Sequence, residues 1–380
     1  MRMKTRLTAR SAGLAALVAA VTAMAAQTPT TLKDAYRGSF HVGAAINEAQ
    51  AAETDTRGAA LAAAQFDSIS PENALKWERI HPEPNTYRFD LADQYVAFGE
   101  KHHMFIVGHC LVWHNQIPGW VFRDDKGDFV DRETLLKRMH DHIQTVVGRY
   151  KGRIQSWDVV NEALNDDGTL RETPWQKIIG EDYIAKAFQY AHEADPQAQL
   201  TYNDYSLENP AKRKGALALI TKLKAQGIPI TSVGMQGHNG LEWPSAEQED
   251  TSISEFAGGG VKVAISELDI DVLPPVPHQQ SADVTLKIEQ DPKLNPYAAG
   301  LPQPVEQELA KRYAGLFAVF LKHRDVVTRV TLWGVTDADS WRNDWPVKGR
   351  TSYPLLFDRN GQPKPAFQAV LRLASPAKTE

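Results

Sequence analysis

Short apolar runs alternate with longer amphipathic segments along most of the chain. Eight of these runs are typical of buried parallel strands, because they are short, rich in β-branched residues and bounded by polar or glycine-containing turns. The eight predicted strands cover residues 41–47, 66–70, 105–113, 156–162, 199–204, 232–238, 261–267 and 329–335.

Between these runs, apolar residues recur at helical spacing. The pattern is clearest in residues 131–149, 211–225 and 305–322. Strand–helix alternation repeated eight times predicts an α/β fold, a single-domain (β/α)₈ TIM barrel. A doubly wound open sheet is the alternative, but no Gly-x-Gly-x-x-Gly motif follows the first predicted strand.

One connection is unusually long. Residues 274–304 are proline-rich and polar and show no clear period. The segment is interpreted either as an insertion that shapes one rim of the active-site face or as an inert surface loop.

Composition is consistent with one large core. The chain has 380 residues, 42% of them hydrophobic, and a formal net charge of −5. No long run carries charge of one sign, so nucleic acid is not an expected partner. The only cysteine, Cys110, rules out an internal disulfide, so the core must hold the domain together.

The first 25 residues have the pattern of a signal peptide. Four basic residues precede an apolar stretch at 12–21, and Ala23-Met24-Ala25 offers a cleavage site. We therefore predict a signal peptide at 1–25, a catalytic barrel at 26–375 and export to the periplasm or the medium. A membrane anchor is the alternative, but the apolar stretch is short and alanine-rich.

Two glutamates carry the most informative chemistry. Glu162 and Glu267 each close a predicted buried strand, where an acidic residue contributes nothing to packing. The carboxyl ends of parallel barrel strands form the active-site face, so both side chains are expected in one pocket. Glycoside hydrolysis needs such a pair, one to protonate the leaving oxygen and one for the anomeric carbon. The alternative is that each glutamate is a structural partner of an arginine or lysine.

The surroundings favour a sugar site, because sugars need hydrogen-bonding groups for their hydroxyls and aromatic platforms for their C–H faces. Tryptophans and polar residues gather near the predicted strand ends: Trp77, Trp113, Trp157, Trp333, Trp341, Trp345, Glu72, Asn73, Lys76, His109, His114, Asn161, Asn203, Gln236 and His238. We expect Trp157 to be core, and Trp333 and Trp341 to stack on sugar rings. No metal-binding spacing accompanies the histidines, and residues 102–103 and 140–142 are expected on helices and exposed to solvent.

At these residues the chain resembles the retaining endo-β-1,4-xylanases of glycoside hydrolase family 10. The matching segments run in family order over nearly the whole mature chain. They are ENALKW at 72–77, GHCLVWH at 108–114, WDVVNE at 157–162, YNDY at 202–205, GMQGH at 234–238, SELD at 266–269 and WGVTD at 333–337.

The resemblance implies roles for these residues. Glu162 would be the acid/base and Glu267 the nucleophile, with Asn161 bonded to the 2-hydroxyl of the sugar being cleaved. Gln236 and His238 would orient Glu267. Glu72, Asn73, Lys76, His109, Trp113, Trp333 and Trp341 would line the glycone subsites, and Tyr205 would flank the aglycone side.

The resemblance also implies a cis peptide between His109 and Cys110. Two positions depart from the family pattern: Cys110 stands where threonine is usual, and Ser206 where asparagine is common. Ser206 bears on aglycone contacts and leaves the chemistry untouched.

The expected activity is hydrolysis of internal β-1,4 bonds of xylan with retention, which requires the two carboxyl groups roughly 5–5.5 Å apart. Xylan and xylo-oligosaccharides are the expected partners of a monomer that needs no cofactor and no metal. Two alternatives remain: a barrel acting on β-glucans or only on short xylo-oligosaccharides, and a sugar-binding barrel without catalysis. Both carboxylates and their polar surroundings are present, which argues against the second.

Overall fold

The computed structural model describes residues 30–276 and 288–374. The predicted signal peptide at 1–25 therefore lies outside the described residues and stays a prediction, as does the part of the long connection at 277–287. Within the described ranges, no helix combines the length and apolar character needed to cross a membrane.

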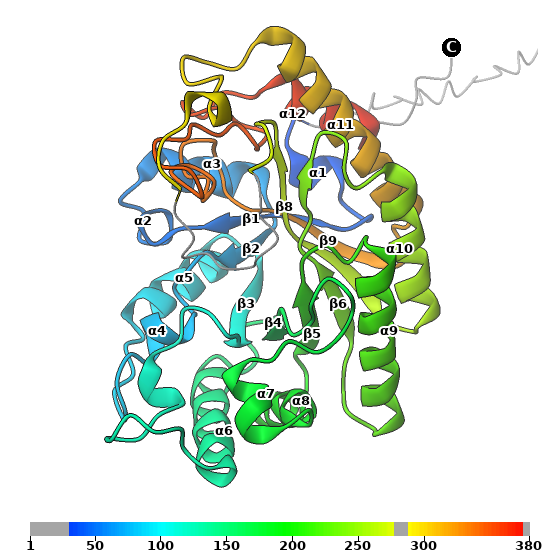
Figure 1. Ribbon diagram of the computed structural model, residues 1–380. Helices are drawn as coiled ribbons and strands as arrows, with labels where there is room; N and C mark the ends of the chain where they lie inside the picture. The colour runs from blue at the N-terminus through cyan, green and yellow to red at the C-terminus, as the bar shows by residue number, and fades with distance from the viewer. Residues whose placement is uncertain (1–29, 277–287, 375–380) are drawn as a thin grey trace, which may run out of the picture.

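The strands close into a parallel barrel, which confirms the predicted fold (Figure 1). They are β1 (His41–Ile46), β2 (Ser68–Pro71), β3 (Phe105–Val112), β4 (Ser156–Asn161), β5 (Gln199–Asp204), β6 (Ser232–Met235), β7 (His238–Gly240), β8 (Lys262–Asp271) and β9 (Val327–Leu332). Strand β1 pairs with both β2 and β9, and β6 pairs with β8, so that eight strands form the ring. All eight predicted strands are present.

Strand β7 was not predicted as a separate element. The run at 232–238 breaks after β6 because Gly237 takes a φ of 76°, in the left-handed region that glycine adopts readily. The chain then pairs with the upper part of β8, with His238 opposite Asp269. This pairing places His238 beside the end of β8.

Strand β8 also runs beyond its predicted end. It was expected to stop at Glu267, but it continues to Asp271 because Leu268 and Ile270 are fully buried and β7 pairs alongside. Residues before and after Glu267 in β8 therefore pair with neighbouring strands, whereas Glu162 follows the last residue of β4.

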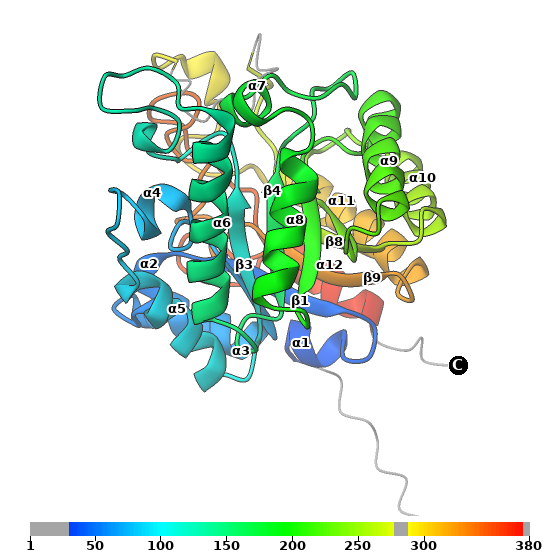
Figure 2. The ribbon, with the colours of Figure 1, turned by 90° about the horizontal axis from the view of Figure 1, so that it is seen from below.

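Helices surround the barrel (Figures 1 and 2), and α6 and α8 lie side by side on its outer face. The α-helices are α1 (Leu32–Ala35), α2 (Glu48–Ala51), α3 (Thr56–Gln65), α4 (Trp77–Ile80), α5 (Asp90–Lys101), α6 (Arg132–Arg149), α7 (Pro174–Ile179), α8 (Tyr183–Ala194), α9 (Pro210–Ala225), α10 (Ala246–Gly258), α11 (Gln303–Lys322) and α12 (Pro365–Ala374). Short 3₁₀ helices lie at Gly119–Val121 and Pro292–Leu294. The three helices predicted most clearly are α6, α9 and α11.

Local sequence explains where these helices begin. Asp131 accepts a hydrogen bond from the Thr134 N–H and caps α6. Asn209 caps α9, whose first residue is a proline, and Ser245 forms a capping box with Gln248 at the start of α10.

Trp157 belongs to the core, as predicted. It is fully buried, and its indole packs on Gly108 of the neighbouring strand. A Cβ atom at position 108 would lie 2.1 Å from that ring, so glycine is required there.

The expected exposure of the histidines was wrong in part. His142 lies on α6 but is fully buried, with its ring stacked on Trp77 at 3.6 Å between centroids and its Nδ1 3.3 Å from that of His81. An apolar stripe on one side of α6 places it inside the protein. His102 and His103 follow the last residue of α5 and are not within it.

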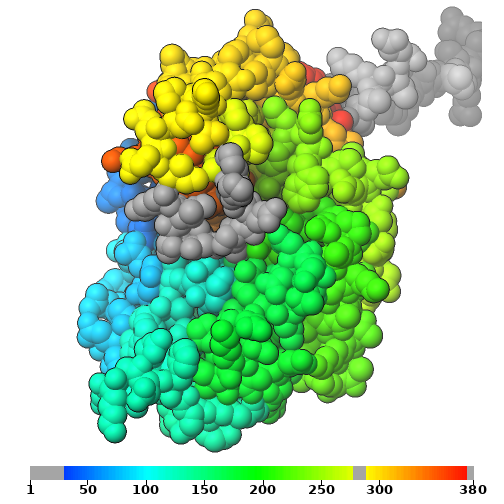
Figure 3. All heavy atoms as spheres, in the orientation of Figure 1, coloured from blue at the N-terminus to red at the C-terminus, as the bar shows by residue number. Residues whose placement is uncertain are grey.

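The described part of the long connection packs against the loop that follows β9. The Ile288 N–H donates to the Pro346 carbonyl at 2.7 Å, and the Asn295 amide donates to the Gly349 carbonyl at 3.0 Å. In the space-filling view, residues from 288 to about 300 (yellow) form the upper part of the barrel face, facing the cyan and green loops (Figure 3). This position favours the rim interpretation over the inert loop.

Candidate active site

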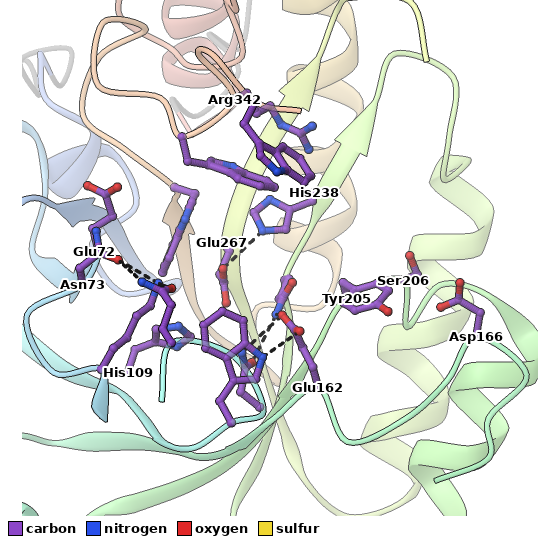
Figure 4. Close-up of a pocket in the computed structure, with 18 residues that line it drawn as sticks. Glu72, Asn73, His109, Glu162, Asp166, Tyr205, Ser206, His238, Glu267 and Arg342 are labelled. Carbon is purple, nitrogen blue, oxygen red and sulfur yellow. Dashed lines mark hydrogen bonds and ion pairs between the residues drawn. The ribbon is translucent and has the colours of Figure 1, made fainter. Parts of the chain in front are cut away.

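A cleft of about 570 Å³ opens at the carboxyl ends of the barrel strands. Its lining includes all thirteen predicted site residues, which were Glu72, Asn73, Lys76, His109, Trp113, Asn161, Glu162, Tyr205, Gln236, His238, Glu267, Trp333 and Trp341. Gln116, Asp166, Ser206, Arg342 and Trp345 also line it. Figure 4 shows Glu162 and Glu267 near the centre, Glu72 and Asn73 at one end, and Tyr205, Ser206 and Asp166 at the other.

Glu162 has the environment of an acid. Its Oε2 accepts a hydrogen bond from the Trp113 indole at 2.9 Å, and its Oε1 accepts one from the Gln236 amide at 3.0 Å. Burial raises the pKa of its carboxyl, and the negative charges of Asp204 and Glu267 raise it further. A carboxyl with a raised pKa keeps its proton at higher pH and can donate it.

Glu267 has the environment of a base or nucleophile. Burial alone would raise the pKa of its carboxyl, but the hydrogen bond from His238 and the charges of His109 and His238 outweigh burial and lower the pKa. The His238 Nε2 lies 3.3 Å from Glu267 Oε2, and the Asn203 amide donates to Oε1 at 2.7 Å. Glu267 is therefore ionised over most of the pH range.

One predicted contact was wrong. Gln236 was expected to orient Glu267, but its side-chain amide binds Glu162 and Asn161. Only its backbone carbonyl meets Glu267, as acceptor for that residue's N–H at 2.8 Å. The Gln236 N–H also donates to the Asp204 carbonyl at 3.0 Å, so the backbone of Gln236 is fixed between two strands while its side chain binds Glu162 and Asn161.

Asn203 is the functional residue that the predicted site omitted. Its amide donates both to Glu267 and to the Asn161 carbonyl oxygen, the latter at 2.9 Å. It thus links the two halves of the cleft. The sequence places Asn203 in the YNDY motif, among the polar residues near the predicted strand ends, but the pattern did not indicate which groups its amide would bind.

His238 is held as a cation. Its Nδ1 lies 3.1 Å from Asp269 Oδ1, and Asp269 also accepts from the Arg342 guanidinium and from the Trp341 indole. Burial works against the charge, but the Asp269 and Glu267 carboxylates raise the pKa of His238 to about 9. Arg342 and His238 in turn hold the pKa of Asp269 far below its usual range, against the effect of burial.

One end of the cleft, where the glycone subsites were predicted, is built on Lys76. Its ammonium donates to the Asn73 oxygen at 3.1 Å and to the Gln116 oxygen at 2.7 Å, and it lies 5.2 Å from the centre of the Trp113 ring. Burial raises the pKa of the nearby Glu72 carboxyl. These groups offer several donors and acceptors to a sugar from one side of the cleft.

Aromatic rings line the same part of the cleft. Trp333 meets His109 edge-on at 5.3 Å between centroids, and Trp341 stacks on Trp345 at 4.4 Å. His109 is itself fixed by Asp158, 3.0 Å away in the barrel interior. The expected cis peptide between His109 and Cys110 is present, and the Cys110 side chain is buried.

Comparison with known proteins places this site in a family. The profile described as glycosyl hydrolase family 10 matches residues 31–373. The chain is 45% identical to endo-1,4-beta-xylanase A of Xylanibacter ruminicola, over 92% of this chain and 95% of that protein. It is 42% identical to the beta-1,4-xylanase of Dictyoglomus thermophilum, over 90% of each.

Solved structures agree. A GH10 endoxylanase retrieved from a sugarcane soil metagenome superposes with a TM-score of 0.87 at 48% identity, covering 91% of this chain and all of that one. A mutant protein in complex with xylotriose superposes with a TM-score of 0.80 at 36% identity, covering 90% of this chain and 99% of that one.

Proposed function

The chain belongs to glycosyl hydrolase family 10 and is an endo-1,4-β-xylanase, and we propose that its Glu267 and Glu162 cleave xylan by double displacement with retention. The observation that carries the proposal is that two buried carboxyls share one cleft with different partners: Trp113 and Gln236 bind Glu162, whereas Asn203 and His238 bind Glu267. In these surroundings the pKa of Glu162 is raised and that of Glu267 is lowered. Environments that separate two carboxyl pKa values in this way are typical of an acid paired with a nucleophile.

In the first step the ionised Glu267 carboxylate attacks the anomeric carbon and forms a glycosyl–enzyme ester. Glu162 gives its proton to the leaving oxygen, so that the departing chain leaves as a neutral alcohol. Asn203 and His238 hold the Glu267 carboxylate in place, while Trp113 and Gln236 hold Glu162.

In the second step Glu162, now ionised, takes a proton from water. As that proton leaves, the water oxygen attacks the anomeric carbon from the side that the leaving chain vacated, and Glu267 departs as a carboxylate. Two inversions at the same carbon give net retention. Asn161 lies between the two glutamates through its bonds with Asn203 and Gln236, a position suited to the 2-hydroxyl of the reacting sugar.

We further propose that the substrate chain lies along the cleft, with its glycone part between Lys76, Trp113 and Trp333 and its aglycone part against Tyr205. Xylan and xylo-oligosaccharides are the corresponding partners. Export through the N-terminal 25 residues suits an enzyme that acts on a polymer, and detection of the processed protein outside the cytoplasm of its producing cells would test it.

Retention is the direct test of this mechanism. Proton NMR of the first reducing ends formed from xylohexaose is expected to show β-anomers, with α-anomers arising only later by mutarotation. Initial α-anomers would mean that water attacks directly, and the assignment of Glu267 as nucleophile would then be wrong.

The pH dependence of kcat/KM gives a second test. The profile reports the free enzyme, and it requires Glu267 ionised and Glu162 protonated. We therefore expect an acid limb below the usual carboxyl value of 4.5 and an alkaline limb above it. Asp269→Asn should move the acid limb of the profile to higher pH. It removes the charge that keeps His238 protonated, and a neutral His238 no longer lowers the pKa of Glu267.

Asp271→Asn is the matched control. Asp271 lies two residues further along β8 and pairs with Arg342 and Arg350, each at 3.3 Å, but no described contact joins it to His238. The acid limb of the Asp271→Asn profile should stay at the pH of the unmodified enzyme. An equal displacement in both variants would show that the effect comes from general loss of negative charge and not from His238.

A further inference from the structure

We propose that Arg171 is a positioning residue that fixes the acid/base Glu162 and the aglycone platform Tyr205 relative to each other. The inference rests on the proposed function and extends it to a residue that no motif singled out. Arg171 itself does not line the cleft, so it acts through the groups that it binds.

One guanidinium group makes all of the contacts. The Arg171 Nε donates to the backbone carbonyl of Glu162 at 3.1 Å. One terminal nitrogen donates to the Leu164 carbonyl at 3.0 Å and to the Tyr205 hydroxyl at 2.7 Å. The acid/base residue and the ring expected under the first aglycone sugar therefore share a single, rigid, planar donor.

The backbone of Glu162 needs such support. Its φ is 58°, in the left-handed region that residues other than glycine rarely adopt. The Glu162 N–H donates to the Asn203 carbonyl at 2.8 Å, and its own carbonyl is the one that Arg171 binds. These two bonds clamp the peptide groups on both sides of the Glu162 Cα, and they set the direction of its side chain.

Arg171 is brought there by a short reverse turn. The chain folds back after Glu162, with an antiparallel bridge between Leu164 and Leu170, and the Arg171 N–H donates to the Ala163 carbonyl at 2.8 Å. The turn therefore determines where Arg171 lies relative to Glu162, nine residues earlier in the chain.

Tyr205 is held on its other side by charge. The fully buried Lys212 ammonium lies 3.3 Å from the centre of the Tyr205 ring and pairs with Asp204 at 3.0 Å. Asp204 accepts from the backbone N–H of Tyr205 at 2.9 Å and of Leu164 at 3.3 Å. The loop after Glu162 and the Tyr205 ring are thus linked both through Asp204 and through Arg171.

The test replaces the planar Arg171 guanidinium, which has several N–H donors in fixed directions, by a lysine ammonium. Arg171→Lys is expected to lower kcat/KM on xylotetraose by roughly 10–100-fold, because a small displacement of a catalytic group has effects of that size. An aryl β-xylobioside with a good leaving group needs neither protonation nor an aglycone sugar, so its kcat/KM should stay near that of the unmodified enzyme. The alkaline limb of the xylotetraose profile should also shift, since it reports Glu162.

Arg138→Lys is the matched control. Arg138 also binds backbone carbonyls of a loop, those of Trp120, Val121 and Arg123, but its loop does not carry a proposed catalytic residue. The proposal is overturned if the two substrates fall equally in Arg171→Lys, or if that variant behaves like Arg138→Lys. Should Arg171→Lys fail to fold, Tyr205→Phe removes only the hydroxyl acceptor and is expected to affect xylotetraose but not the aryl substrate. No difference between the substrates there would overturn it.

Glu162→Ala distinguishes an error in the role of Arg171 from an error in the role of Glu162. If Glu162 is not the acid/base, Glu162→Ala itself will show no preference for activated substrates. If Glu162→Ala shows that preference and Arg171→Lys does not, the function stands and the positioning role falls.

Discussion

Glu267→Ala is expected to lower kcat on xylan by roughly 10⁴–10⁶-fold, a loss of the size that follows removal of one member of a serine protease's catalytic triad. The physical reason is that no glycosyl–enzyme ester can form without this carboxylate. Glu162 cannot replace it, because Trp113 and Gln236 bind its carboxyl and the pKa of that carboxyl is raised. Release of reducing sugar from xylan measures the loss.

A folding control must accompany this variant, because it removes a buried carboxylate from two donors. Glu267→Ala leaves the Asn203 amide and the His238 Nε2 without their partner. Glu267→Gln keeps the shape and an acceptor oxygen, so it should fold and still be inactive. Thermal unfolding followed by circular dichroism checks the fold of both.

Labelling identifies the nucleophile independently of the rate. A 2-fluoro-xylobioside with a good leaving group should trap the unmodified enzyme as an ester, and peptide mass spectrometry should find the label on Glu267. Normal xylan hydrolysis by folded Glu267→Gln, or a label on another residue, would contradict the assignment.

The barrel was predictable because its strands are buried on both faces. Such strands appear as short β-branched runs whose position needs no knowledge of their neighbours, and all eight were found. The prediction failed where the bounds of a strand depend on its pairing partner. The extension of β8 past Glu267 depends on the pairing partner β7, and β7 depends on the turn at Gly237.

The same distinction applies to the site. Thirteen residues of the cleft could be predicted from the family resemblance and because strand ends of a barrel converge on one face, which brings residues as distant as Glu72 and Trp341 together. The hydrogen-bond partners of each side chain could not be predicted. Gln236 and Asn203 both carry amides at strand ends, but the direction of each side chain decides that Gln236 serves Glu162 and Asn203 serves Glu267.

Arg171 shows the limit most clearly. It lies in a loop with no apolar period, nine residues after Glu162, and its sequence context resembles that of any surface arginine. Its proposed role depends on three acceptors that only the folded chain brings together: the carbonyls of Glu162 and Leu164, and the hydroxyl of Tyr205, which follows β5. His142 is the converse case, because a polar residue on an amphipathic helix is expected outside, yet its ring fills a gap beside Trp77.

Glu162→Ala is expected to lower kcat on xylan by roughly 10²–10⁴-fold, the usual contribution of a general acid. An aryl xylobioside with a good leaving group should still react in the first step, because its leaving group departs without a proton. The second step should then be slow, since no base activates water. Stopped-flow measurement should therefore show a burst of the aryl alcohol followed by slow turnover.

Azide distinguishes this mechanism from simple damage to the cleft. It is an anionic nucleophile that needs no general base, and Glu162→Ala opens space for it between the Trp113 indole and the Gln236 amide, the two donors that held the carboxyl. Added azide should speed turnover of the aryl substrate and give a β-xylobiosyl azide, because Glu267 still forms the ester and is displaced with inversion. Glu162→Gln, which fills the space, should show the burst but little rescue. Absence of both the burst and the azide product in folded Glu162→Ala would show that Glu162 is not the acid/base.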